Sequence, residues 1–161
     1  MTHGSEATPD PSAEDTQSKP EAIAAESLRG IRVAIVEDEG MTAWQLRKIL
    51  ARAGMEVVGA APDGREGVTL VLKERPDLVL MDINMPVMDG LEAARLILAQ
   101  FEVCVVMLTA FAVPEYRERA KRLGACGYVI KPITGDSLLP QIERAYHAFS
   151  GRKGSAAGEA G

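Results

Sequence analysis

The sequence predicts an α/β domain with a doubly wound, five-stranded parallel sheet and helices on both of its faces. Five short apolar runs of strand length alternate with five amphipathic segments, and glycine or proline residues separate many of them. Strict alternation of strand and helix favours a parallel sheet joined by right-handed crossovers. A chain of 161 residues has room for one such domain and terminal segments.

The expected elements of the first half end at recognisable stop signals. A helix over Met41–Ala53 has apolar residues at helical spacing and stops before Gly54, and a helix over Arg65–Glu74 stops at the Arg75-Pro76 step. The short apolar runs between them predict the strands Ile31–Glu37, Glu56–Ala61 and Leu78–Met81.

The second half continues the same alternation. Val103–Leu108 is apolar throughout, as expected for a strand covered on both faces. Proline suits the first turn of a helix and glycine its end, which is the pattern of Pro114–Leu123 followed by Gly124. The remaining expected elements are a helix over Leu91–Gln100, a strand over Gly127–Ile130 and a helix from Asp136 to about Phe149, in which Pro140 is tolerable only near the first turn.

The two ends of the chain differ from its middle in composition. Residues 1–30 are rich in Ser, Thr, Pro, Glu and Ala, lack aromatic residues and carry six acids against two bases. Such a segment buries too little apolar surface to offset its ordering entropy, so we expect a disordered acidic N-terminal tail. Residues 150–161 predict a flexible C-terminal tail. The folded domain is therefore expected over residues 31–149.

The bulk composition narrows the class of protein. Residues 31–150 hold sixteen acids and fourteen bases, so nothing supports a basic surface for nucleic acid. Cys104 and Cys126 form no CxxC motif, and Cys104 lies in an apolar run, which favours a free thiol in a reducing cytosol. Because the sequence has no signal peptide and no long apolar run, we expect a cytoplasmic protein without a membrane segment.

Polar residues stand at the carboxyl ends of four expected strands. Parallel strands of a doubly wound sheet end at one edge, where ligands bind, so these side chains are expected to share one cleft. They are Glu37 and Asp38 after the first strand, Asp82 and then Asn84 after the third, Thr109 after the fourth and Lys131 after the fifth.

The clustered carboxylates predict a magnesium site. Neighbouring carboxylates repel each other, and a divalent cation removes that repulsion. Magnesium takes oxygen ligands and keeps several waters, so Asp38 and Asp82, with Glu37 directly or through water, are sufficient side-chain ligands. The backbone carbonyl of Asn84 is a further candidate ligand.

A metal-bound aspartate beside a hydroxyl and a lysine suits phosphoryl transfer, with Asp82 as the nucleophile and Thr109 and Lys131 on the phosphoryl oxygens. Each residue alone also has an ordinary explanation. Asp82 or Asp38 can cap a turn or a helix, Thr109 can be structural, and Lys131-Pro132 is common turn chemistry. Taken together, the four strand ends favour the phosphoryl-transfer site.

Four pieces of the sequence carry a resemblance to a known family. They are IVEDE (35–39), LVLMDINMPVMDG (78–90), MLTA (107–110) and GYVIKP (127–132). Over residues 31–149 the chain resembles the receiver (response-regulator) domains of bacterial two-component signalling, including the single-domain regulators of chemotaxis type. It is also similar to receivers that precede RNA-binding antiterminator output domains, although no output domain is expected after Phe149. The resemblance implies a flavodoxin-like fold with strand order 2-1-3-4-5.

The resemblance also implies a role for each site residue. Asp82 would be the phospho-acceptor, Glu37 and Asp38 the acidic pair that holds Mg²⁺, and Asn84 the source of a carbonyl ligand. The pair begins with Glu rather than Asp, a common variation in the family that leaves metal binding credible.

Thr109 and Lys131 would contact the phosphoryl group, and Tyr128 would be the switch aromatic that moves inward when the threonine shifts. Strand filling is the other explanation for Tyr128, since tyrosine favours strands.

Trp44, the single tryptophan, is expected on an exposed helix surface. At about 100° per residue it lies on the far side of its helix from Leu46. Because tryptophan is enriched at interfaces and the first helix of the family helps to dock phosphodonor histidine helices, Trp44 is a candidate partner anchor. Cover by the N-terminal tail is the alternative.

The expected function is that of a stand-alone response regulator. A histidine kinase or histidine phosphotransfer protein would phosphorylate Asp82 with Mg²⁺, and the surface of the fourth helix, fifth strand and fifth helix would contact an unidentified protein effector or form a homodimer. Such a chain would catalyse only its own phosphorylation and dephosphorylation. Two alternatives are a phosphate-independent scaffold and a haloacid-dehalogenase-type hydrolase, but Asn84 stands where that hydrolase needs a second acid.

Overall fold

A computed structural model describes residues 26–160, and side chains through Arg152. Within these residues five strands alternate with five helices. In chain order they are β1 (Arg32–Val36), α2 (Gly40–Arg52), β2 (Glu56–Ala61), α3 (Gly64–Glu74), β3 (Leu78–Asp82), α4 (Gly90–Leu98), β4 (Cys104–Thr109), α5 (Pro114–Leu123), β5 (Gly127–Ile130) and α6 (Gly135–Ala160).

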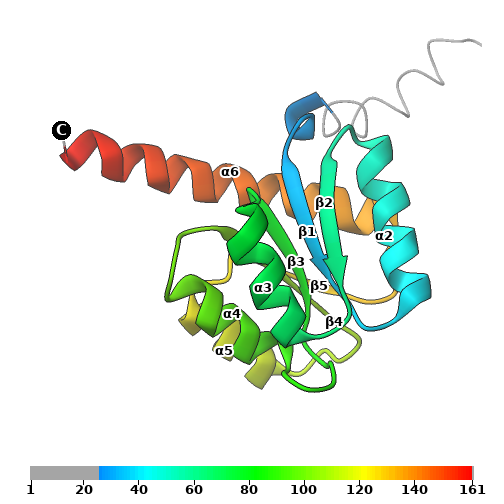
Figure 1. Ribbon diagram of the computed structural model, residues 1–161. Helices are drawn as coiled ribbons and strands as arrows, with labels where there is room; N and C mark the ends of the chain where they lie inside the picture. The colour runs from blue at the N-terminus through cyan, green and yellow to red at the C-terminus, as the bar shows by residue number, and fades with distance from the viewer. Residues whose placement is uncertain (1–25, 161) are drawn as a thin grey trace, which may run out of the picture.

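All five strands form one parallel sheet in the order β2-β1-β3-β4-β5 (Figure 1). The first strand, β1, lies in the interior of the sheet, and the second, β2, lies at one edge. The third, β3, pairs with the opposite side of β1, so the direction of winding reverses between β1 and β3. The predicted fold class, strand order and parallel pairing are confirmed. The carboxyl ends of β1 and β3 therefore lie side by side at the point where ligand sites form in such sheets.

Helices cover both faces of the sheet, and each face has its own apolar core (Figure 1). On one face α2 and α6 pack Leu46, Leu50 and Ile142 against the strands. On the other face α3, α4 and α5 contribute Val71 and Ile97 among others. Side chains of β3 and β4 alternate between the two cores, and all are buried, which explains why these strands are almost continuously apolar in sequence.

The last helix is longer than the sequence predicts. The predicted end near Phe149 is wrong, because α6 continues to Ala160 through residues expected to form a flexible tail. The extension contains three glycines, which disfavour helix, beside alanine, lysine and glutamate, which favour it, and no proline interrupts it. Pro140 lies inside this helix, beyond the first turn that the sequence analysis allowed. Neither α6 nor any other helix of the described residues is long and apolar enough to cross a membrane.

The packed unit begins before residue 31, where the sequence analysis places the start of the folded domain. Residues 26–28 are helical, and Leu28 is buried in the core formed with α2 and α6. One apolar side chain thus anchors the entry to β1. The rest of the predicted N-terminal tail, residues 1–25, lies outside the described residues.

Two glycines allow loops to approach the carboxyl edge of the sheet closely. A Cβ atom on Gly90 would overlap the carbonyl oxygen of Asp82, and the Gly90 N–H donates to the Ile83 carbonyl at 2.7 Å. A Cβ on Gly64 would likewise overlap the Met88 carbonyl oxygen. The first turn of α4 therefore packs directly on the backbone of the residue with which β3 ends.

This contact predicts that Gly90→Ala destabilises the fold by about 1 to 3 kcal/mol, because the added methyl group must displace the end of β3. Urea unfolding measures the effect. Gly40→Ala is the matched control, since Gly40 also opens a helix but a Cβ there meets nothing within 4 Å. If both variants changed the free energy of unfolding equally, the close approach at Gly90 would not matter.

Candidate functional site

The predicted site residues stand at the carboxyl ends of the strands. Asp82 and Thr109 are the last residues of β3 and β4. Glu37 directly follows β1, and Lys131 directly follows β5. The backbone joins the last two strand ends, because the Lys131 N–H donates to the Thr109 carbonyl at 2.7 Å.

Three carboxylates gather at this edge. One oxygen from each of Glu37, Asp38 and Asp82 lies within 4.8 Å of the other two. Glu37 and Asp82 are only 4% and 3% exposed, whereas Asp38 is open to solvent. Two of the acids are therefore enclosed by the protein, and the third is accessible to solvent.

Lys131 provides the positive charge of the cluster. Its Nζ lies 2.8 Å from Glu37 Oε1 and 3.5 Å from Asp82 Oδ2. Burial of the ammonium opposes its charge, but the contacts with Glu37 and Asp82 outweigh burial and raise the pKa of Lys131. Lys131 therefore stays protonated and neutralises one of the three carboxylates.

Asp82 holds an unfavourable charge in this arrangement. Burial, followed by repulsion from Glu37, raises the pKa of Asp82 from 3.8 to about 7, although Lys131 acts in the opposite direction. A carboxyl group that is costly to ionise gains from any further cation beside it. Such a shift within a cluster of charged strand-end residues is typical of a functional group rather than of a structural cap.

The cluster fits a divalent cation by the chemistry of its donors and by its excess of negative charge. All the donors are oxygens, which Mg²⁺ prefers. Lys131 is the ion-pair partner of the buried Glu37 Oε1 and of Asp82, and one ammonium leaves the three carboxylates short of positive charge. An additional cation would reduce the repulsion among the three carboxylates. Asn84 lies exposed in the loop after β3, and its role as a carbonyl ligand stays a prediction.

A short hydrogen-bonded connection runs from Thr109 to Tyr128. The buried Thr109 hydroxyl accepts a hydrogen bond from the Phe111 N–H at 3.1 Å. The Tyr128 hydroxyl donates to the carbonyl of the same Phe111 at 3.2 Å. The sequence predicts both end residues, but it gives no sign of the main-chain group between them.

Cationic side chains lie over the rings of the half-buried Tyr128 and the exposed Trp44. The guanidinium of Arg117 is 4.9 Å from the centre of the Tyr128 ring, a contact that the sequence analysis missed because it joins a helix to a strand. Lys48 lies 4.4 Å from the Trp44 ring, one helical turn away on α2. Trp44 is 54% exposed, which confirms its predicted exposure. Its proposed cover by the N-terminal tail concerns residues outside the described part of the chain.

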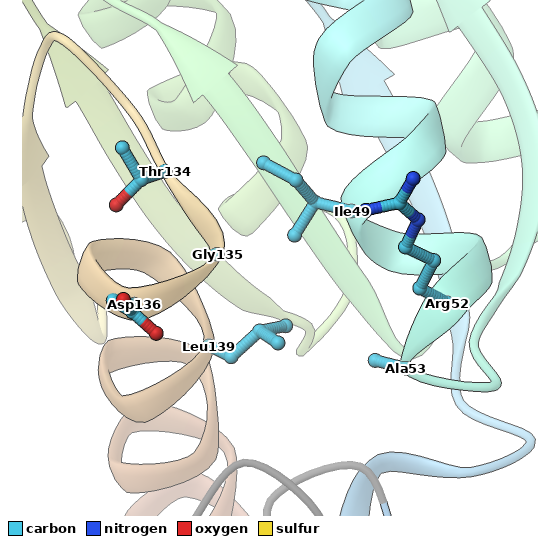
Figure 2. Close-up of a pocket in the computed structure, with 7 residues that line it drawn as sticks. All are labelled: Ile49, Arg52, Ala53, Thr134, Gly135, Asp136 and Leu139. Atoms are coloured by element: carbon cyan, nitrogen blue, oxygen red, sulfur yellow. The ribbon is translucent and has the colours of Figure 1, made fainter. Parts of the chain in front are cut away.

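A separate pocket of about 280 Å³ lies between α2 and the start of α6 (Figure 2). Its lining combines apolar side chains with the single charges of Arg52 and Asp136, and it contains none of the strand-end residues. The carboxylate cluster, not this pocket, holds the groups that can perform chemistry. The residues around the pocket are Ile49, Arg52, Ala53, Thr134, Gly135, Asp136 and Leu139.

Comparison with curated proteins finds transcriptional regulatory proteins and protein-glutamate methylesterases among the relatives. The chain is 42% identical over 118 residues to the transcriptional regulatory protein PdtaR of Mycobacterium tuberculosis, and this match covers 73% of the chain and 58% of PdtaR. It is also 42% identical over 104 residues to a protein-glutamate methylesterase/protein-glutamine glutaminase of Archaeoglobus fulgidus, of which it covers 30%. The chain thus spans little more than half of the length of one relative and a smaller part of the other.

Solved structures give the same result. The chemotaxis response regulator CheY4 of Vibrio cholerae superposes with a TM-score of 0.67 at 34% identity, covering 72% of this chain and 98% of that one. The response regulator domain of Thermotoga maritima CheB superposes with a TM-score of 0.65 at 31% identity, covering 76% of this chain and 98% of that one.

Residues 33–143 match the response regulator receiver domain, and they contain all the strand-end residues of the cluster. The match covers well over half of the sequence and every strand after the first residue of β1. The chain therefore belongs to the response regulator receiver domains of two-component systems.

Proposed function

We propose that this chain is a response regulator that accepts a phosphoryl group on Asp82 from a histidine kinase or a histidine phosphotransfer protein, in a reaction that requires Mg²⁺. The observation that carries the proposal is the convergence of Glu37, Asp82 and Lys131 from three different strands on one small volume. A structural role would not need three charged groups at the edge of an apolar sheet, since buried charges are costly. The proposal includes the cytoplasmic location of such a pathway.

The residues of the cluster have distinct roles in the proposed reaction. A carboxylate oxygen of Asp82 attacks phosphorus, the new O–P bond forms and the P–N bond to the donor histidine breaks. Lys131, which Glu37 holds at 2.8 Å, is oriented to pair with a phosphoryl oxygen. The Thr109 hydroxyl hydrogen-bonds a second phosphoryl oxygen. Glu37, Asp38 and Asp82, with the Asn84 carbonyl, would hold Mg²⁺, which would supply positive charge for the carboxylates and the phosphoryl group.

Phosphorylation is proposed to reach the surface through Phe111. When the Thr109 hydroxyl turns toward the phosphoryl group, its present hydrogen bond from the Phe111 N–H weakens. The loop after β4 is then free to move, and the carbonyl of Phe111 no longer holds the Tyr128 hydroxyl in place. This gives Thr109 and Tyr128 the switch role that the resemblance implies, by a main-chain connection.

The proposed output surface is formed by α5, β5 and α6, which correspond to the fourth helix, fifth strand and fifth helix of the sequence analysis. Tyr128 belongs to this surface, so a change at Thr109 has a direct route to it. An unidentified protein effector is the proposed partner, and a homodimer through the same surface would use the same residues. A relay intermediate or a phosphate sink would require only the phosphorylation step.

The phospho-acceptor role predicts a covalent adduct. Incubation with a small acyl phosphate and Mg²⁺ should add the mass of one phosphoryl group, as an acid-stable and base-labile modification detected by intact mass spectrometry. Asp82→Asn should abolish the adduct, whereas Asp136→Asn, which changes an exposed aspartate of α6, should retain it. An unmodified wild-type protein would support a phosphate-independent scaffold, and rapid hydrolysis of unrelated phosphate esters would support a hydrolase.

The repulsion within the cluster predicts that Asp82→Asn stabilises the metal-free protein. In EDTA at about pH 8 the variant should be more stable by roughly 1 kcal/mol or more, or about 3 to 6 °C in Tm. Because the pKa of Asp82 is raised from 3.8 to about 7, the cost of its ionisation is absent at low pH and complete above pH 7. The difference should therefore grow as the pH rises toward 7, as differential scanning calorimetry can measure. Mg²⁺ should stabilise wild type more than the variant, and a less stable variant in EDTA would contradict the proposed repulsion.

The exposed tryptophan predicts a partner contact. Trp44→Ala should slow phosphotransfer from a kinase or phosphotransfer protein that phosphorylates the wild type by about tenfold or more, as expected for an interface anchor. Modification by a small acyl phosphate should be unchanged, because that reaction needs no protein surface. Gln45→Ala, an exposed neighbour on α2, is the control. Equal phosphotransfer rates in all three proteins would exclude the contact.

A further inference from the structure

A positively charged groove of about 810 Å³ lies between α5 and α6. Four basic residues and no acidic residue line it: Arg117, Lys121, Arg144 and Arg152. Cys126 also lines the groove, at the amino end of β5 and thus at the opposite edge of the sheet from Asp82. The thiol therefore stands where an anionic or polar reagent can approach it.

Cys126 has a basic partner supplied by the extended part of α6. Nη2 of Arg152 donates to Cys126 Sγ at 3.3 Å. The backbone of Cys126 is held as well, because its N–H donates to the Val105 carbonyl at 2.8 Å. A guanidinium on a partly exposed thiol stabilises the thiolate, which is the form that reacts with oxidants.

Cys104, the first residue of β4, is the second thiol of the pair. Its side chain is fully buried in the core beneath α2 and α6, and Cys126 packs against the same core. The register of β4 and β5 places Cys126 beside Val105, one residue further along than Cys104. The two side chains thus pack in one core from neighbouring strands, one register step apart, which is the arrangement that a disulfide between them requires.

The surroundings make the two thiols unequal. The neighbouring Cys104 thiol and the charge of Arg152 lower the pKa of Cys126, whereas the neighbouring Cys126 thiol and burial raise the pKa of Cys104. The accessible thiol is thus the more acidic one, and the thiol behind it keeps its proton. A cysteine that only filled the core would need neither the arginine nor the groove.

We propose that Cys126 is a site of oxidation by peroxides and that Cys104 resolves the oxidised form into an intramolecular Cys104–Cys126 disulfide. This chemistry is independent of the proposed phosphorylation at Asp82. Because Cys126 lines a groove of the proposed output surface, its oxidation would couple the redox state of the surroundings to that output surface.

The reaction balances with peroxide as the oxidant. The Cys126 thiolate attacks one peroxide oxygen, an S–O bond forms, the O–O bond breaks, and the leaving hydroxide takes up a proton to become water. The Cys104 sulfur then attacks the sulfenic sulfur of Cys126, the S–S bond forms, and the Cys104 proton leaves with the hydroxyl group as a second water. Two thiols lose two electrons, and hydrogen peroxide is reduced to two waters.

Exposure of the full chain to hydrogen peroxide tests this pair. Intact mass should fall by two hydrogen masses, peptide mapping should join Cys104 to Cys126, and a dithiol reductant should reverse both changes. In Cys104→Ala the oxidation should stop at a sulfenic acid on Cys126, which dimedone traps. In Cys126→Ser the buried Cys104 should not react. Dimers joined by disulfides, or oxidation without the internal link, would overturn the proposal.

The arginine contact has its own control. Arg152→Gln should slow oxidation of Cys126 by about threefold or more, whereas Arg144→Gln, which removes another positive charge from the same groove, should leave the rate unchanged. Equal rates in both variants would exclude the role of Arg152. All variants should still react with the acyl phosphate at Asp82, which separates a failure of the thiol chemistry from a failure of the fold or of the proposed phosphorylation.

Discussion

The ion pairs of Lys131 with two buried carboxylates are the interaction on which the rest of the site depends. Glu37 and Asp82 are almost fully enclosed, and Lys131 Nζ contacts both. One ammonium cannot balance three carboxylates, so the fold holds a deficit of positive charge at the carboxyl edge of the sheet. The apolar cores on either side stabilise the strands that carry this deficit. A divalent cation and a phosphoryl group are a pair of ligands that suits such an edge, because the cation neutralises the acids and the lysine remains for the phosphoryl oxygens.

Residues fixed by topology could be predicted from the sequence, and residues fixed by packing between distant elements could not. The strand ends were predictable because parallel strands must finish at one edge, which brings Glu37, Asp82 and Lys131 together whatever the details of the helices. The groups that join Arg152 to Cys126, or Phe111 to Tyr128, meet across different elements and leave no periodicity. The end of α6 was also missed, since Gly151, Gly154 and Gly158 are stop signals in the sequence, yet the helix continues through them.

β5 connects the two regions proposed to be functional. Cys126 precedes its first residue and Lys131 follows its last, so the thiol and the ammonium are separated by one short strand, about 16 Å of extended chain. Tyr128 lies between them on that strand and reaches the loop after β4. A displacement of β5 would therefore be felt at the phosphorylation edge and in the groove between α5 and α6. Both proposals thus concern one rigid segment, although their chemistry is separate.

The hydrogen bonds that connect Thr109 and Tyr128 use the main chain of residue 111, and this has a consequence for how the sequence can vary. The donor and the acceptor are the N–H and C=O of Phe111, while its side chain is 54% exposed. Nearly any amino acid at this position provides the same two groups, and proline alone lacks the donor. The side chain at position 111 can therefore change in size or polarity without breaking the connection. Tolerance to substitution at this position would be a sign of where the connection runs, rather than a sign that the residue is unimportant.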